Sequence, residues 1–192
     1  EALRLKGKGA EYIFMQCLPD AIMTALKSAD RVNYNVPFFG TWTSTDPDVW
    51  KLGKGVIRNR LFMQFCGVLP QDKTPGIEIM QKLWDRYKTV SKFDASYWEG
   101  VVVAMIMERA FHRASGLFGK VNAETINKAL ETFQNEDFGG LVPKTTYTKT
   151  DHQGSFTARI VKINEDATYE PMSNFFVPGK GEVKVLKTPA IK

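Results

Sequence analysis

Residues 11–40, EYIFMQCLPDAIMTALKSADRVNYNVPFFG, decide the fold class of this chain of 192 residues. The apolar runs at 12–15 and 36–40 each have the length of a buried strand. Between them, Pro19 suits the first turn of a helix, and apolar residues recur at helical spacing over 22–32. A strand, a helix and a second strand in this order predict a βαβ unit, whose parallel strands are joined by a right-handed crossover.

The same alternation continues on both sides of this unit. Residues 1–8 predict the end of a helix that Gly9 stops. Downstream, Thr45-Asp46-Pro47 offers a cap for a short helix that ends at Gly53, and residues 61–65 predict a third strand. Three strands of this kind predict the α/β class, with a parallel sheet covered by helices.

A helical region is predicted after residues 70–76, where turn and breaker residues cluster. The first helix has its apolar face over 77–84. The second, over 95–114 and closed by Gly116, is apolar nearly all round over 101–107, so we expect a buried core helix whose last turns are polar. A third helix is predicted over 122–133.

The sequence changes character again after Gly139-Gly140. β-branched or alternating runs at 145–148, 156–163 and 168–172 are separated by turn residues. These runs predict an antiparallel β meander, followed by a tail rich in Gly, Pro and Lys.

Composition excludes several classes of function. The net charge is +5, but basic and acidic residues are interleaved along the chain. The densest basic run, over 4–8, has no aromatic residues beside it, so we expect a solvated surface and no nucleic-acid partner. The longest apolar run, 101–107, falls well short of the about 20 residues that a membrane span needs. We therefore expect the protein to be peripheral to a membrane at most.

The sequence carries no motif for catalysis, a cofactor or a metal. It has no glycine-rich phosphate loop, nucleophile elbow or paired-histidine motif. Asp46-Pro47-Asp48 is better explained as a helix start than as a metal site. Cys17 and Cys66 are the only cysteines, and we favour two thiols over a disulfide because each lies in a strand-like apolar run. We expect no enzyme.

The ordered set of these elements resembles the branched-chain amino acid binding proteins of ABC transporters, in the first structural class of periplasmic binding proteins. Three stretches carry the resemblance: residues 11–40 with their final Phe-Phe-Gly, Trp98-Glu99-Gly100-Val101 at the start of the long helix, and the turn at 147–155. The resemblance covers essentially the whole chain.

This resemblance implies the C-terminal half of a two-lobed binding fold, because family members have about twice this length. It assigns residues 1–69 to the second-lobe α/β core, incomplete at its N-terminus, and residues 70–140 to first-lobe helices after a hinge crossing. Residues 141–192 would be the hinge return, the second-lobe β meander and the C-terminal tail.

The candidate site follows from strand order alone. Open parallel sheets bind ligands at the carboxyl ends of their strands. That rule selects Gln16 and Cys17 after the first strand and Thr41, Trp42 and Thr43 after the second. They offer amide and hydroxyl hydrogen bonds and one flat aromatic wall, as small-molecule sites do. The alternative is that Trp42 packs under a loop and Gln16 faces solvent.

The resemblance adds two points about the ligand. In amino-acid-binding relatives an acidic residue, two places after the glycine of the second strand, holds the ammonium group of the ligand. Trp42 stands there in this chain, so the resemblance implies an aromatic or apolar carboxylate, or another amino-acid-like compound. Relatives also place an aromatic residue at the start of the long helix, where this chain has Tyr97 and Trp98; both are otherwise ordinary core aromatics.

The function implied is that of a periplasmic solute-binding component of an ABC transporter, which holds a small organic ligand in a cleft between lobes and presents it to the permease. A ligand-sensing domain of a receptor or regulator is an alternative use of the same fold. A structural or adhesive protein is a third alternative, which would need no cleft.

Overall fold

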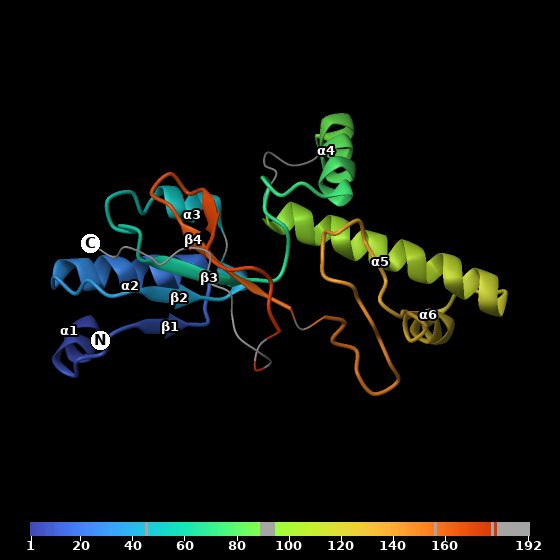
Figure 1. Ribbon diagram of the computed structural model, residues 1–192, viewed down its shortest axis with the longest axis horizontal. Coiled ribbons are helices and arrows are strands. Elements are labelled where there is room, and N and C mark those ends of the chain that lie inside the picture. The colour runs from blue at the N-terminus through green and yellow to red at the C-terminus, as the bar shows by residue number, and fades with distance from the viewer. Residues whose placement is uncertain (45, 89–94, 156, 178, 180–192) are drawn as a thin grey trace. The chain divides into compact units, whose positions relative to one another are not determined.

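The computed structural model describes residues 1–44, 46–88, 95–155, 157–177 and 179. Thr45, Phe156 and the tail from 180 onward, which enter the predictions above, lie outside the described residues. The chain divides into two compact units (Figure 1). Unit 1 is formed by Glu1–Cys66 and Thr157–Lys192, and unit 2 by Gly67–Phe156. The predicted assignment of three segments to two lobes and a hinge stays a prediction.

Unit 1 is built on a mixed sheet of five strands in the order β1-β2-β3-β4-β5. The strands are β1 (Ile13–Met15), β2 (Phe38–Gly40), β3 (Leu61–Phe65), β4 (Arg159–Ile163) and β5 (Tyr169–Pro171). The first three run parallel, while β4 is antiparallel to β3 and β5 is antiparallel to β4. The predicted α/β class is confirmed.

The predicted meander needs one correction. Strands β4 and β5 confirm its antiparallel pairing, and they extend the parallel sheet at β3. Residues 145–148 form no strand of this sheet; they take part only in isolated bridges, Glu136 with Thr145 and Thr146 with Gly154. The alternation of side chains predicted extended backbone correctly, but pairing partners depend on contacts distant in sequence.

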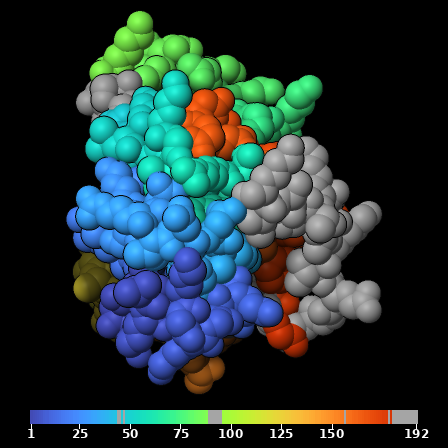
Figure 2. Space-filling view, turned by 90° about the vertical axis from the view of Figure 1, so that its left-hand side faces the viewer, coloured from blue at the N-terminus to red at the C-terminus, as the bar shows by residue number. Residues whose placement is uncertain are grey.

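The helices of unit 1 are α1 (Ala2–Gly7), α2 (Pro19–Arg31) and α3 (Pro47–Lys51). Helix α2 buries Ile22, Leu26 and Ala29 of the stripe predicted from its spacing, while Val32, its fourth member, is the C-cap and is half-buried. The connections β1–α2–β2 and β2–α3–β3 step in the same direction across the sheet, and right-handed crossovers in one direction place their helices on one face. Figure 2 shows the surface of α1, α2 and the segment after α3 in succession from bottom to top.

A buried arginine ties α2 to the sheet at the end opposite the strand carboxyl ends. Arg60 is 1% exposed, and its guanidinium donates to the backbone oxygens of Tyr34 at 2.9 Å and Leu26 at 3.3 Å. The guanidinium also lies over the ring of Phe38, 5.7 Å from its centroid. Burial lowers the pKa of Arg60, and the nearby carboxylate of Asp30 opposes that shift. Hydrogen bonds to backbone oxygens offset part of the cost of burying this cation.

Unit 2 contains α4 (Pro75–Tyr87), α5 (Ala95–Phe118) and α6 (Ala123–Leu130). All three predicted helices are confirmed, and Asn122 caps α6 by accepting from the backbone N–H of Thr125 at 3.0 Å. Helix α5 is longer than predicted, because Gly116 lies within it. The helix ends before Gly119, whose φ of +66° is the left-handed conformation typical of a C-terminal stop.

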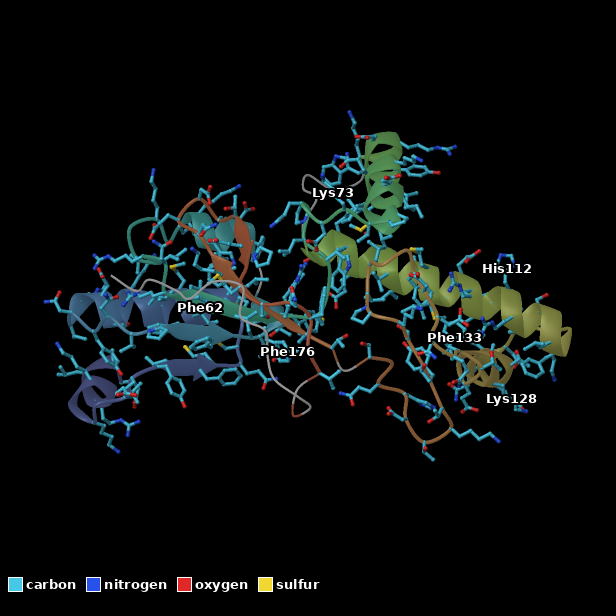
Figure 3. All side chains as sticks on the ribbon, in the orientation of Figure 1. Phe62, Lys73, His112, Lys128, Phe133 and Phe176 are labelled. Carbon is cyan, nitrogen blue, oxygen red and sulfur yellow. The ribbon has the colours of Figure 1, made fainter. Side chains whose placement is uncertain are left out.

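The prediction that the apolar stretch at 101–107 is buried all round is wrong for this chain. Val101 and Val102 are buried, but Val103 is 54% exposed and Phe111 is also exposed. The buried stripe meets α6 and the segment after it through a core of Ala110, Phe133 and Phe138; Figure 3 marks Phe133. The apolar sequence predicted that the surface of α5 is buried, but other residues of this chain bury only part of that surface.

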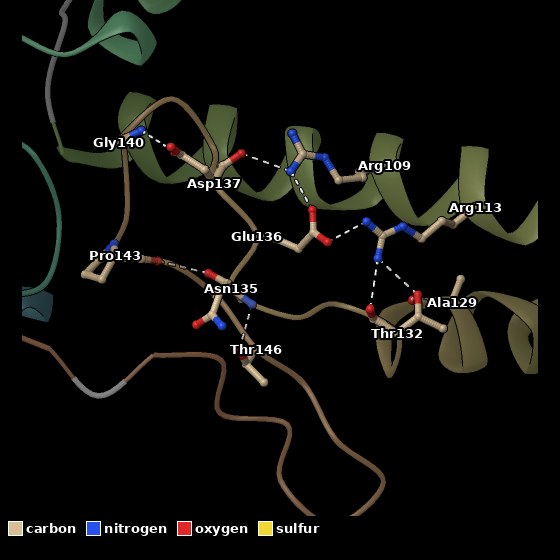
Figure 4. A network of polar contacts seen from close by, with 11 residues as sticks. Arg109, Arg113, Ala129, Thr132, Asn135, Glu136, Asp137, Gly140, Pro143 and Thr146 are labelled. Carbon is tan, nitrogen blue, oxygen red and sulfur yellow. Dashed lines mark hydrogen bonds and ion pairs between the residues drawn. The ribbon is translucent and has the colours of Figure 1, made fainter.

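Two arginines of α5 hold the segment that follows α6 (Figure 4). Arg109 donates to a carboxylate oxygen of Glu136 at 2.9 Å and to the backbone oxygen of Asp137 at 2.9 Å. Arg113 pairs with the other carboxylate oxygen of Glu136 and donates to the backbone oxygen of Thr132 at 3.0 Å. Burial alone would raise the pKa of Glu136, but hydrogen bonds and charge from Arg113 and Arg109 outweigh it, so the pKa is lowered.

This network predicts an acid-sensitive contribution to stability. Because the pKa of Glu136 is lower in the folded state, its stabilisation is complete above the ordinary value of 4.5 and is lost as pH falls through the folded-state pKa. Glu136→Gln should cost about 1–3 kcal/mol at pH 7. The difference from wild type should shrink between pH 5 and pH 3, roughly the range where carboxylates titrate, in urea unfolding at each pH.

Glu124→Gln is the matched control, since Glu124 forms an exposed ion pair with Lys128 at 2.7 Å. Surface pairs contribute little to stability. A Glu136→Gln variant with the same pH dependence as wild type would contradict the role assigned to this carboxylate.

Candidate functional site

The candidate site lies at the edge of the unit 1 sheet where the parallel strands end. Met15, Gly40 and Met63 share one row of the register across β1, β2 and β3. Gln16 and Cys17 directly follow the end of β1, and Thr41–Thr43 directly follow the end of β2. The structure therefore places these predicted residues in two neighbouring loops at one edge of the sheet.

Side chains pack closely against Gly40, the last residue of β2. A Cβ at this position would lie 2.5 Å from Sδ of Met63 and 2.8 Å from Cδ1 of Ile22. Both distances are shorter than van der Waals contact, so a side chain on Gly40 would displace α2 or β3 side chains. The missing side chain lets α2 approach the carboxyl end of β2, and this places the start of α2 beside the loop after β2.

The loop after β2 presents an aromatic surface next to hydroxyl groups. Trp42 begins the 3₁₀ turn Trp42–Ser44 and is 38% exposed. The hydroxyl oxygens of Thr41 and Thr43 lie 2.8 Å apart in a hydrogen bond. Asp46 closes the loop as the N-cap of α3, with its carboxylate accepting from the backbone N–H of Asp48 at 2.9 Å. Asp46 thus serves a helix start, as the sequence predicted.

The loop after β1 offers an amide and a thiol. Gln16 is exposed, while Cys17 is half-buried. Burial raises the pKa of the Cys17 thiol, and the carboxylate of Asp20 raises it further. The thiol therefore stays protonated and neutral near pH 7. Cys17 and Cys66 are both thiols, as the sequence favoured.

Gln64 is a residue of this region that the sequence reasoning missed. It lies on β3, one position beyond the row of Met15, Gly40 and Met63, and its side chain is exposed. Together with Gly40 it lines an open groove on the sheet. The available signal was one amide in the otherwise apolar strand LFMQF.

Tyr97 and Trp98 belong to unit 2 and have the surroundings of packed aromatics there. Trp98 is buried, and its indole N–H donates to the backbone oxygen of Leu141 at 2.9 Å. Its ring lies so close to Gly67 that a Cβ there would be 2.2 Å from it. Tyr97 is half-buried and donates its hydroxyl to the backbone oxygen of Met80 at 3.3 Å. Trp98 thus matches the core alternative that the sequence left open.

The described residues offer little for other chemistry. No group of three His, Cys, Asp or Glu residues that could hold a metal ion occurs among them. Each histidine is exposed and lies near a glutamate, His112 at 3.1 Å from Glu108 and His152 at 3.7 Å from Glu131. In the part of the chain that the structure describes, no helix combines the length and apolarity required to cross a membrane.

Comparison with known proteins gives one family. The sequence profile of the family described as "Periplasmic binding protein" matches residues 1–168. No curated protein matches the chain at a significant level.

Solved structures share the fold at low sequence identity. A branched-chain amino acid ABC transporter protein from Thermus thermophilus with bound valine has a TM-score of 0.81 at 21% identity over 92% of this chain. A fatty acid ABC transporter substrate-binding protein from Thermomonospora curvata has a TM-score of 0.81 at 18% identity over 93%. A leucine binding protein from Thermotoga maritima has a TM-score of 0.75 at 12% identity over 92%. The chain spans 48%, 46% and 47% of these structures, respectively.

The contact between Gly67 and Trp98 predicts the effect of one methyl group. Gly67→Ala should destabilise unit 2 by about 1–3 kcal/mol, because the indole ring cannot bend away as a flexible chain end can. Urea unfolding followed by near-UV circular dichroism measures the loss.

Gly100→Ala is the control, since a Cβ at Gly100 meets nothing within 4 Å on helix α5. It should be neutral or stabilise the protein by about 0.5–1 kcal/mol through helix propensity. Equal effects of the two substitutions would show that the indole does not constrain Gly67.

Proposed function

Because the chain belongs to the periplasmic binding protein family, we propose that it supplies one wall of the ligand site in a periplasmic solute-binding protein of an ABC transporter. The family consists of binding proteins and not of enzymes, so the proposed activity is reversible capture without a covalent step. The proposed partners are a small organic ligand and the transporter permease.

The observation that carries this proposal is the grouping of Gln16 and Thr41–Thr43 at the carboxyl edge of the parallel strands. Ligands of open α/β sheets bind at this edge because loops and helix starts converge there. In the proposed site Gln16 donates or accepts through its amide, and Thr41 and Thr43 supply hydroxyl groups. Cys17 and Gln64 flank these residues as neutral polar groups.

Trp42 favours an apolar or aromatic carboxylate as the ligand. A desolvated ammonium group needs a compensating negative charge, which an indole lacks. A cation–π contact would replace that charge only in part, at about 0.5–2 kcal/mol. The face of Trp42 suits an apolar chain or a ring, and one similar structure is described as a fatty acid ABC transporter substrate-binding protein.

The rest of the proposed site lies beyond this wall. The resemblance assigns Tyr97 and Trp98 to the same ligand from the other lobe, and Tyr97 is the better candidate because the N–H of Trp98 is already bonded to Leu141. Groups that hold the ligand carboxylate would come from the part of the protein that this chain does not include. Affinity therefore requires the intact gene product.

Ligand screening of the intact gene product tests the proposal. Phenylacetate and octanoate should raise its melting temperature more than leucine does, because binding to the folded state adds RT ln(1 + [L]/Kd) to stability. Trp42→Ala should weaken phenylacetate binding about 3–10-fold in calorimetric titration, which is the contribution of one aromatic contact. Trp42→Glu should shift the preference toward leucine.

Tyr87→Ala serves as the control, since Tyr87 is an exposed aromatic on α4 far from the candidate loops in sequence. It should leave every affinity unchanged. Tight leucine binding by the wild-type protein would keep the binding function and reject the ligand class. If substitution of Trp42 leaves the ligand affinity unchanged, the site does not lie at the carboxyl edge of the sheet.

A further inference from the structure

The loop between α3 and β3 binds a carboxylate from the far end of unit 1. Residues 53–59 form this loop, and two of its backbone N–H groups donate to one side chain. Oε2 of Glu165 accepts from the N–H of Gly55 at 2.6 Å, and Oε1 accepts from the N–H of Arg58. Glu165 lies in the turn between β4 and β5, 110 positions after Gly55. In Figure 1 the orange turn after β4 lies beside α3 and the segment that follows it.

The backbone of this loop has the shape of an anion site. Gly55, Arg58 and Asn59 have φ values of +80°, +45° and +58°, all in the left-handed region. Left-handed residues next to right-handed ones turn backbone N–H groups toward one side, and such concave segments bind anions. Nε of Arg58 closes the loop by donating to the backbone oxygen of Gly55 at 2.9 Å, and Ile57 is buried in the core. The loop therefore presents its two donors from a fixed backbone.

The turn that carries Glu165 is held by the side chains around it. The carboxylate of Asp166 accepts from the backbone N–H of Thr168 at 3.0 Å and from its hydroxyl at 2.6 Å. Nδ2 of Asn164 donates to the same hydroxyl at 3.0 Å. These bonds fix the turn without using the carboxylate of Glu165, which reaches across to the loop instead.

A negative charge at this place also stabilises the buried cation nearby. Arg58 pairs with Asp30 of α2 at 3.0 Å, and Asp30 lies 3.9 Å from the guanidinium of Arg60. Burial lowers the pKa of Arg60, and the charges of Asp30 and Glu165 oppose that shift. The carboxylate of Glu165 thus serves two backbone N–H groups and contributes to the balance of charge around Arg60.

We propose that the loop of residues 53–59 is a carboxylate-binding site and that Glu165 is its resident ligand. Two N–H donors that face two oxygens of one group suit a carboxylate, since an amide offers only one acceptor oxygen. Occupation by Glu165 ties the β4–β5 hairpin to the loop after α3. The inference does not depend on the proposed ligand, because this loop precedes the amino end of β3 and the candidate site lies at the carboxyl ends of the strands.

Chemical rescue in the intact gene product tests the proposal. Glu165→Ala removes the carboxylate and leaves space for a small anion. Hydrogen exchange at the amides of Gly55 and Arg58, followed by NMR, should become about tenfold faster in this variant because both N–H groups lose their acceptor. Formate at about 0.2 M and constant ionic strength should restore at least half of the protection with a saturable concentration dependence. Formamide, its neutral counterpart of similar size, should restore none.

Two further variants complete the test. Glu170→Ala is the matched control, since Glu170 lies in the same hairpin but pairs with the side chain of Lys162 at 2.6 Å. It should leave exchange at both amides unchanged, with or without formate. Glu165→Gln keeps the size of the side chain, so it tests the charge even if the alanine variant does not fold; it should lose protection at one amide and gain nothing from formate.

Unchanged exchange in Glu165→Ala would overturn the proposal, as would rescue by formamide equal to that by formate. A loss of protection that formate does not restore would show that Glu165 only joins the hairpin to the loop and that the loop is no anion site. Full protection of both amides in Glu165→Gln would likewise contradict the assignment.

Discussion

The absence of a side chain at Gly40 is the constraint on which the arrangement of unit 1 depends. It brings Ile22 of α2 and Met63 of β3 to the same point at the carboxyl end of β2. Because these side chains lie close to Gly40, helix α2 and strand β3 both pack beside the residue that precedes the loop starting at Thr41. Unit 2 also has a glycine in close packing. A Cβ on Gly76 would lie 2.9 Å from the backbone oxygen of Gly139. In unit 1 the space beside the glycine is taken by side-chain ends, whereas in unit 2 it is taken in part by backbone.

The buried and half-buried arginines that stabilise the fold lie outside the candidate site. Arg60 is buried beside Leu26 and Tyr34, and Arg109 and Arg113 bind Glu136 in unit 2. Each arrangement donates hydrogen bonds to backbone oxygens of a helix or of the segment that follows it. By contrast, five residues at the carboxyl edge carry no formal charge, namely Gln16, Cys17, Thr41, Trp42 and Thr43. Burial and the nearby carboxylate of Asp20 both raise the pKa of the Cys17 thiol and keep it protonated. In the proposed site, such a wall would discriminate by shape and hydrogen bonds, and ionic selection would come from other groups.

Local sequence patterns predicted those elements whose formation depends on neighbouring residues. The stripe from Ile22 to Ala29 and the cap at Asn122 both rest on helix geometry, and the structure has both. The join of β4 to β3 could not be predicted, because it pairs Gln64 with Ile160 across almost a hundred residues. The exposure of Val103 was missed for another reason: periodicity shows that a surface is apolar but does not show whether the same chain covers it. Gln64 was missed because a single amide in a strand has no periodic signal.

Gly40 links the packing of the sheet to the candidate site. It lines the groove beside Gln64, and it directly precedes Thr41 and Trp42 of the site loop. On the other face of the sheet, the space beside Gly40 is filled by the ends of the Ile22 and Met63 side chains. The loop after β2 therefore starts from packed backbone, and less conformational entropy would remain to be lost if that loop bound a ligand.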